Sequence, residues 1–504
     1  MSSSSSPGQE VDINESQYGP YPGFETAYTD CPSGARVFSY RRDGELARTD
    51  STLPVLVLLH GYPQNSLMYK QFIDEIPRKW RLLIPDLPGY GNSTKPISSD
   101  SYAHSKRAWG EDILAVVDTL FPPPQTNRTK HTNIIVLGHD RGARLAYRLA
   151  LDAPERVCGA VLLDIVPTVY VWDAMRVERG HNETKKSHHW ITLAAPRPLP
   201  ETLIASSAEF YFNYTLTGWA GRDSELHNPK HPSVIESIAS FLDPDSDRAH
   251  ARIAAVCEDY RAGATHDVEH DLAAGINPFL LLAQSPALLP FTGGGSGGFT
   301  GTTIAISESS ISSSSLPSPS ASPPLSPTEA TSFSSPTSFT FPLRPTSPPS
   351  QPSQPLHHQH HQHQQQYQHR HHHQHNQNHY HNTTNYLQAS TPARTPPFGT
   401  TPLLVLSSHH LRARFDVDTI WKSLGSRVDT SSSNTPSQPF PSASTSASRG
   451  AAQKLFGGIG GSVQSYGVGD ERTGHFIVQE AQWEVGGRVR VWLNKLEDSL
   501  RGEN

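Results

Sequence analysis

The chain has 504 residues, of which 35% are hydrophobic and 43 are proline. This length would ordinarily suggest several domains, but so few apolar residues cannot form a packed core along the whole chain. The 41 lysine and arginine residues against 47 aspartate and glutamate residues give a formal charge of −6, which argues against nucleic acid or a membrane surface as partner. No apolar run reaches the length of a membrane-spanning helix, and the serine-rich start lacks a signal-peptide pattern. We therefore expect a cytoplasmic protein.

The three cysteines, Cys31, Cys158 and Cys257, lie at widely separated positions. A disulfide framework or a zinc site would need closely spaced pairs. We therefore expect all three to be reduced and to lie in or near the core, where free cysteine is frequently found.

Composition separates the folded parts of the chain from the low-complexity parts. Apolar runs alternate with amphipathic stretches over 53–272, whereas 293–397 consists mainly of serine, proline, threonine, glutamine and histidine. Such a segment cannot bury enough apolar surface to offset its ordering entropy. Residues 351–381 hold 12 of the 27 histidines. A histidine-rich tract can bind metal, but no spacing here fixes a coordination geometry.

We expect five parts along the chain. They are a flexible tail at 1–23, a first core segment at 24–167, a helical segment at 168–274, a disordered Ser/Pro/His/Gln-rich insert at 275–400, and a second core segment at 401–504 with a serine-rich loop at 429–450.

Short apolar runs predict strands that are buried on both faces of a sheet. They lie at 55–59, 81–85, 134–137, 160–163 and 403–406. Apolar stripes at helical spacing occur between or after them, at 113–120, 145–150 and 489–500. This alternation predicts a parallel sheet with helices on both faces.

Residues 277–282 also resemble a strand and compete with 401–406 for one position in the sheet. We favour the later segment, because 415–424 supplies the helix that a parallel connection requires.

The run 134–137 leads into Gly138-His139-Asp140-Arg141-Gly142, a pattern with small residues around a central nucleophile. The glycines permit a sharp turn that exposes the middle side chain at the carboxyl edge of the sheet. In the serine form of this turn, the hydroxyl attacks acyl carbon. The carboxylate of Asp140 can instead displace a leaving group from saturated carbon and form an enzyme ester. The pattern therefore points away from esterases and peptidases, and toward cleavage of carbon–halogen bonds or epoxides.

Seven motifs in chain order carry a family resemblance over about 24–274 and 401–500. They are His60-Gly61-Tyr62-Pro63-Gln64, 86–91, 138–144, 163–168, His189-Trp190, 257–264 and Gly474-His475-Phe476. Together they resemble the epoxide hydrolase and dehalogenase branch of the α/β-hydrolases, and most of all the fluoroacetate (haloacetate) dehalogenases. The resemblance implies an α/β-hydrolase fold, a mostly parallel sheet flanked by helices, with a helical cap domain at 168–274. It also implies that no metal or organic cofactor is required and that a homodimer is possible.

The resemblance assigns helpers to the nucleophile. His475 matches the base that activates water against the enzyme ester, and Asp164 matches the acid that orients the imidazole. Asp416 follows the later strand, where epoxide hydrolases often keep this acid, and remains an alternative. The backbone N–H of Tyr62 resembles a donor of the oxyanion-stabilising loop.

Arg141 and Arg144 follow the nucleophile by one and four positions, so on a helix both can hold a small carboxylate through paired N–H groups. The resemblance to the dehalogenases covers both residues, whereas epoxide hydrolases generally place an aromatic residue directly after the nucleophile. The alternative is a pair of surface arginines bound to acids such as Asp152 or Glu155.

Three residues of the expected cap, His189, Trp190 and Tyr260, resemble a pocket for the leaving halide. Their N–H and O–H groups can stabilise fluoride while the cap excludes water, and Trp219 resembles a further lining residue. The alternative for each is packing alone. Epoxide opening normally uses two cap tyrosines as acids. The candidates are Tyr260 together with Tyr170, Tyr211 or Tyr214.

These observations predict a hydrolase that cleaves the carbon–halogen bond of short 2-haloacids, with a small-molecule substrate and without nucleic acid or membrane partners. Two alternatives remain. One is an epoxide hydrolase that uses the same Asp-His-Asp set. The other is a non-catalytic homologue, because the segments 275–400 and 429–450 lie between Asp140 and His475 and could misplace the base. A flexible loop of that length adds only a few kcal/mol of closure entropy, so the fold can survive it.

Overall fold

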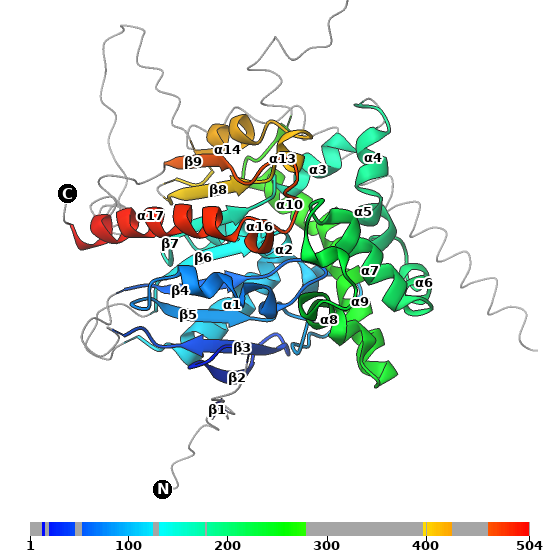
Figure 1. Ribbon diagram of the computed structural model, residues 1–504, viewed down its shortest axis with the longest axis horizontal. Helices are drawn as coiled ribbons and strands as arrows, with labels where there is room; N and C mark the ends of the chain where they lie inside the picture. Colours follow the sequence, from blue (N-terminus) through cyan, green and yellow to red (C-terminus); the bar gives the residue numbers. More distant parts are fainter. Residues whose placement is uncertain are drawn as a thin grey trace, which may run out of the picture. The chain divides into compact units, whose positions relative to one another are not determined.

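The computed structural model describes residues 13–15, 20–45, 53–123, 131–176, 179–278, 397–399, 401–425 and 462–502. In this part of the chain a nine-stranded sheet has the order β1-β2-β3-β5-β4-β6-β7-β8-β9 (Figure 1). The strands are β1 (Ile13–Glu15), β2 (Glu25–Asp30), β3 (Arg36–Arg42), β4 (Val55–Leu59), β5 (Arg81–Pro85), β6 (Ile134–His139), β7 (Val157–Leu163), β8 (Leu403–Ser407) and β9 (Val463–Gly467). The pairs β1–β2, β2–β3 and β3–β5 are antiparallel. The remaining pairs, β5–β4, β4–β6, β6–β7, β7–β8 and β8–β9, are parallel. The predicted, mostly parallel sheet is confirmed.

Alternate residues of the central strands belong to two different apolar cores, as expected for strands that are covered on both faces. Val57 and Leu59 of β4 pack on the side of α1 (Lys106–Leu120) and α2 (Arg141–Asp152). Leu56 and Leu58 pack on the opposite side, with the apolar stripe of α17 (Gln482–Arg501). Because a shift of one residue would exchange the two sets, burial fixes the register of the sheet.

A helical cap lies between β7 and β8 in the chain and covers one end of the sheet (Figure 1). Its helices are α3 (Thr168–Ala174), α4 (Asn182–Lys186), α5 (His188–Leu193), α6 (Leu199–Ala205), α7 (Ala208–Trp219), α8 (Pro232–Ile238), α9 (Ser246–Ala264) and α10 (His266–Ala273). Phe212 of α7 stacks on Phe241 with 4.0 Å between the ring centres. Both rings belong to the apolar core that also contains the inner faces of α1 and α2, so cap and sheet share one buried cluster.

The second core segment completes the fold after the cap. It adds α13 (His409–Arg412), α14 (Val417–Gly425), α16 (Ile477–Glu480) and α17. β8 pairs with β7 and β9, so the later of the two competing segments holds the sheet position, as predicted. Of the earlier segment, 279–282 lies outside the described residues.

Some expected boundaries differ from the structure. The tail expected at 1–23 contains β1, whose residues 13–15 pair with β2, so that expectation was wrong for these residues. The edges of the expected insert 275–400 are also part of the core, because Ile276 and Phe398 are buried in it. Residues 279–396 and the loop expected at 429–450 lie outside the described residues.

The described part of the chain contains no helix that is both long and apolar enough to cross a membrane. Cys31, Cys158 and Cys257 are free and buried, as predicted.

Candidate active site

The turn that contains Asp140 joins β6 to α2. Asp140 has φ 48° and ψ −111°, a conformation that most non-glycine residues avoid. A Cβ atom on Gly138 would lie 2.2 Å from the carbonyl oxygen of Gly142, and one on Gly142 would lie 2.1 Å from that of Leu59. Only glycine therefore fits at either position, and the tight turn places the Asp140 side chain at the carboxyl edge of the sheet.

The carboxylate of Asp140 is buried and ionised. Its Oδ1 accepts a hydrogen bond from the backbone N–H of Tyr62 at 3.0 Å. Burial alone would raise the pKa of Asp140, but His475, Arg144 and Arg141 outweigh this effect and lower it. A carboxylate in this state can act as a nucleophile at neutral pH.

His475 lies between two carboxylates. Its Nδ1–H donates to Asp164 Oδ2 at 2.7 Å, and its Nε2 lies 3.8 Å from Asp140 Oδ2. The backbone N–H of Ser408 donates to the other oxygen of Asp164 at 2.7 Å, which fixes this carboxylate at the end of β7. Burial alone would lower the pKa of His475, but the hydrogen bond and charge of Asp164, together with Asp140, raise it.

The alternative acid, Asp416, has a different place in the structure. It is exposed, and its Oδ1 accepts a hydrogen bond from the backbone N–H of Thr419 at 3.1 Å, in the first turn of α14. Asp164 is thus the one of the two that contacts His475.

His139 is a neighbour of the site that the sequence did not suggest. Its Nε2 lies 2.8 Å from the carbonyl oxygen of His475, and since a carbonyl only accepts, Nε2 carries the proton. Burial lowers the pKa of His139 to about 4. A neutral His139 therefore supports the His475 backbone without adding a charge.

The two arginines after the nucleophile are buried, so they are not the surface arginines of the alternative interpretation. Arg144 Nη1 donates to the carbonyl oxygen of Val166 at 3.0 Å and to Thr168 Oγ1 at 3.2 Å. Its guanidinium carbon lies 4.6 Å from the ring centre of Trp190. In the described part of the chain, Arg144 Nε and Arg141 Nη1 are buried and have no hydrogen-bond partner.

Arg141 is held by an acid that the sequence analysis missed. Its Nε donates to Asp259 Oδ2 at 2.8 Å, and its Nη2 also contacts this carboxylate. Lys106 Nζ pairs with the same carboxylate, and the hydroxyl of Tyr90 donates to it at 2.8 Å. Burial would raise the pKa of Asp259, but Arg141 and Lys106 hold it well below its usual range. Asp259 belongs to the motif 257–264, but nothing in the sequence indicates that it faces α2.

The predicted halide-pocket residues form one aromatic cluster. The ring centre of His189 lies 4.5 Å from that of Trp219 and 5.8 Å from that of Tyr260. The ring centre of Trp190 lies 5.6 Å from that of Tyr260, and the guanidinium carbon of Arg141 lies 4.3 Å from the Tyr260 ring centre. Burial lowers the pKa of His189 well below its ordinary value, so its ring is neutral.

The three cap tyrosines that were candidates for a second acid beside Tyr260, namely Tyr170, Tyr211 and Tyr214, have different surroundings. Burial raises the pKa of Tyr62 and of Tyr260, and Tyr211 adds to both shifts. Tyr214 is 57% exposed and stacks on Phe210. The pKa of Tyr170 is raised by burial, with Asp173 and Asp271 as its charged neighbours.

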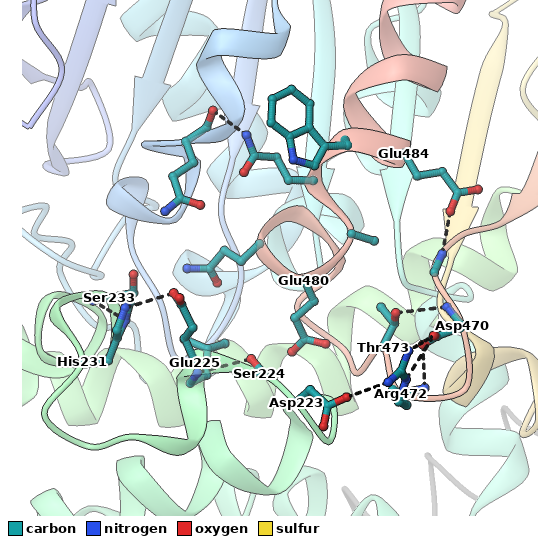
Figure 2. Close-up of a pocket in the computed structure, with 17 residues that line it drawn as sticks. Asp223, Ser224, Glu225, His231, Ser233, Asp470, Arg472, Thr473, Glu480 and Glu484 are labelled. Carbon is teal, nitrogen blue, oxygen red and sulfur yellow. Dashed lines mark hydrogen bonds and ion pairs between the residues drawn. The ribbon is translucent and has the colours of Figure 1, made fainter.

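A cavity of about 590 Å³ opens beside the loop of His475, between the cap and α16 (Figure 2). Its lining includes Asp223, His231, Arg472 and Glu480. None of the predicted site residues lines it. Asp140 is more enclosed, because its side chain is only 11% exposed.

Comparisons with known proteins agree with this architecture. A family model described as alpha/beta hydrolase fold matches residues 54–185. A protein from Nostoc sp PCC 7120 that is described as an α/β hydrolase aligns with 93% of this chain and 98% of its own, with a TM-score of 0.52 and 21% sequence identity. The protein has an α/β-hydrolase fold. This confirms the fold that the motifs predicted.

Two sequence relatives belong to the two branches that the motifs suggested. Fluoroacetate dehalogenase of Burkholderia sp is 32% identical over 219 residues, which are 43% of this chain and 65% of that enzyme. Soluble epoxide hydrolase of Corynebacterium sp. (strain C12) is 30% identical over 112 residues, 22% of this chain and 35% of that enzyme. The chain therefore spans just under two thirds of the first relative and about a third of the second.

The buried charges around α2 yield a stability prediction. Asp259→Asn leaves Arg141 and Lys106 without their shared carboxylate, and we expect the free energy of unfolding to fall by about 3–5 kcal/mol. Urea unfolding followed by circular dichroism measures the loss. The matched control is Asp152→Asn, which removes a partly exposed partner of Arg107 and Arg148. Arg148 keeps Asp271, so this variant should cost about 1 kcal/mol or less. Equal losses from both variants would contradict this description of Asp259.

Proposed function

We propose that the protein is a hydrolase that removes halide from short 2-haloacids through an ester on Asp140. The observation that carries this proposal is the pair of buried donors, Arg141 Nη1 and Arg144 Nε, that lack an acceptor in the described residues. A buried N–H group without a partner costs about 1–3 kcal/mol. Both arginines also lower the pKa of Asp140, so an anion bound to them would lie next to the nucleophile.

Ester formation is the first step of the proposed reaction. The substrate carboxylate binds Arg141 and Arg144, and an oxygen of Asp140 attacks the carbon that bears the halogen. The carbon–oxygen bond forms as the carbon–halogen bond breaks, and the halide leaves with the bonding electrons. The N–H and O–H groups of the aromatic cluster stabilise the departing anion. His189 suits this role because it is neutral, so it offers a donor without adding a fixed charge.

Ester hydrolysis is the second step. His475 Nε2 takes a proton from water, and the resulting hydroxide attacks the carbonyl carbon of the Asp140 ester. Asp164 stabilises the imidazolium that forms. The N–H of Tyr62 already donates to Asp140 Oδ1, so it is placed to stabilise the oxyanion of the intermediate. Collapse of the intermediate releases the hydroxy acid, whose new hydroxyl oxygen takes the proton from His475, and leaves Asp140 as a carboxylic acid, which loses its proton to solvent and so regenerates the carboxylate.

Epoxide hydrolysis is the second candidate, and one observation favours it. Burial and the nearby carboxylate of Asp140 raise the pKa of Tyr260, and Tyr211 adds to the shift, so Tyr260 offers a protonated cap hydroxyl beside Asp140 and Tyr211 is a second cap tyrosine near it. They could protonate the oxygen of an opening epoxide ring. This reaction has no use for two buried arginines, which is why we favour the haloacid.

Substrate selectivity in Arg144→Lys separates the two candidates. Lysine keeps the charge but loses the planar guanidinium, so we expect kcat/KM for fluoroacetate and chloroacetate to fall by about 100-fold, and kcat/KM for styrene oxide, if it is turned over, to change by less than about threefold. Halide release and diol formation are measured side by side, and Asp140→Asn is the control that should turn over nothing. Equal losses on acid and epoxide would mean that Arg144 is structural. Diol without halide from the unsubstituted protein would assign it to epoxide hydrolysis.

The raised pKa of His475 predicts the pH dependence. His475 must be neutral to accept a proton, and a raised pKa keeps it protonated to a higher pH. In the ester Asp140 is uncharged, but Asp164, the main cause of the raised pKa, still faces His475, so steady-state kcat should fall as pH decreases through a value above 6.5, the ordinary histidine pKa. The rate constant of the first halide release, measured by rapid quench, should not follow this limb, because ester formation does not use His475. An acidic limb of kcat well below pH 6.5 would contradict the assignment.

A further inference from the structure

The loop that carries His475 is bonded to the cap as well as to the sheet. The backbone N–H of His475 donates to the carbonyl oxygen of Trp219 at 2.8 Å, and the N–H of Arg222 donates to that of Arg472 at 2.9 Å. The ring of Trp219 packs edge-on against the His475 imidazole, with 5.7 Å between the ring centres. The end of α7 and the residues after it, 219–222, are therefore bound directly to 472–475.

Glycine permits this approach from both sides. A Cβ atom on Gly221 would lie 2.0 Å from the carbonyl oxygen of Arg472, and one on Gly474 would lie 2.2 Å from the backbone nitrogen of Gly221. A side chain at either position would therefore push the backbones of 219–222 and 472–475 apart, whereas a side-chain group from outside the two segments can still bridge them.

The bridging group is the carboxylate of Glu480, at the end of α16 (Figure 2). Its two oxygens lie 3.0 and 3.1 Å from the backbone nitrogen of Gly221, which donates to them. The N–H of Gly474 donates to the same carboxylate. Glu480 thus accepts from the cap and from the residue directly before His475.

We propose that Glu480 is a positioning residue that ties 219–222 of the cap to the loop of His475 and so holds the imidazole in place for ester hydrolysis. The part that concerns hydrolysis rests on the proposed function. Ester formation uses Asp140, the two arginines and the donors of the aromatic cluster, none of which is hydrogen-bonded to Glu480; Trp219 enters the tie through its backbone carbonyl oxygen. Loss of Glu480 should therefore slow the second step and spare the first.

The test compares Glu480→Gln with Glu484→Gln. Glutamine keeps the size of the side chain, but its NH₂ group faces the N–H of Gly221 or Gly474 and cannot accept from it. Glu484 lines the same cavity and accepts from the N–H of Gly469 at 2.8 Å; it serves as the matched control.

Two measurements are made on each full-length variant. In Glu480→Gln, amide hydrogen exchange of 219–222 and 472–476 should become at least about tenfold faster. With chloroacetate, the first equivalent of chloride should appear at a rate within about threefold of the unsubstituted protein, followed by a steady state about 10–100-fold slower. Glu484→Gln should change neither quantity.

The outcomes distinguish this inference from the proposed function. Unchanged exchange in Glu480→Gln would overturn the tie itself, and this result does not depend on any substrate. Faster exchange with equal slowing of both chemical steps would overturn the positioning role. If the unsubstituted protein releases no chloride, the proposed function has failed, and hydrogen exchange alone decides the tie.

A second variant keeps the test valid if Glu480→Gln does not fold. Gly221→Ala places a methyl group against the carbonyl oxygen of Arg472 and separates the same two segments from the cap side. It should reproduce the faster exchange at 472–476 and the slower steady state. Normal exchange and kinetics in this variant would overturn the proposal.

Discussion

The buried, ionised carboxylate of Asp140 is the group on which the rest of the site depends. An unpaired charge in this position would cost several kcal/mol, and its burial alone favours the protonated form. His475, Arg144 and Arg141 reverse that preference. Their approach is possible only because the glycines at 138 and 142 allow the tight turn between β6 and α2. The tight turn and the surrounding charges are thus both required, since neither alone keeps an ionised Asp140 carboxylate at the edge of the sheet.

The positively charged side chains around the site face two acids, Asp140 and Asp259. Asp259 binds Arg141 and Lys106, which leaves Arg144 as the guanidinium without a carboxylate partner among its hydrogen bonds. Among the described residues, each arginine still keeps a buried donor without an acceptor. An anionic substrate would satisfy these donors and add a negative charge next to Asp140, where the arginines offset the repulsion. Under the proposed function, Asp259 neutralises part of the positive charge of Arg141 and Lys106, so that the charge left at the site suits a single small anion.

Much of this arrangement could be predicted from the sequence, because it follows from local patterns. The buried strands are continuous apolar runs; Asp164 directly follows one of them, and Asp140 follows another after Gly138 and His139. The strands β2 and β3, which lie between the edge strand β1 and β5, were not predicted, since polar residues interrupt their apolar pattern. The burial of Arg141 against Asp259 could not be predicted either, because it depends on how α9 packs on α2.

The hydrogen bonds that tie the cap to the His475 loop could not be predicted from the sequence either. Glu480 and Gly221 are separated by 259 residues, and neither belongs to a motif that indicated chemistry. The loop of His475 takes support from three places, the sheet through His139, the end of β7 through Asp164, and the cap through Trp219. A long insertion between Asp140 and His475 is compatible with this geometry, since these contacts set the position of His475.

The most direct test of the account is to trap the ester. In His475→Gln the carboxylate can still attack but water is not activated, so treatment with chloroacetate should release roughly one equivalent of chloride per chain. Mass spectrometry of the digested protein should then find a carboxymethyl ester on the peptide that contains Asp140, and none in Asp140→Asn. Continued chloride release without a modified Asp140, or the same modification on another residue, would contradict the mechanism.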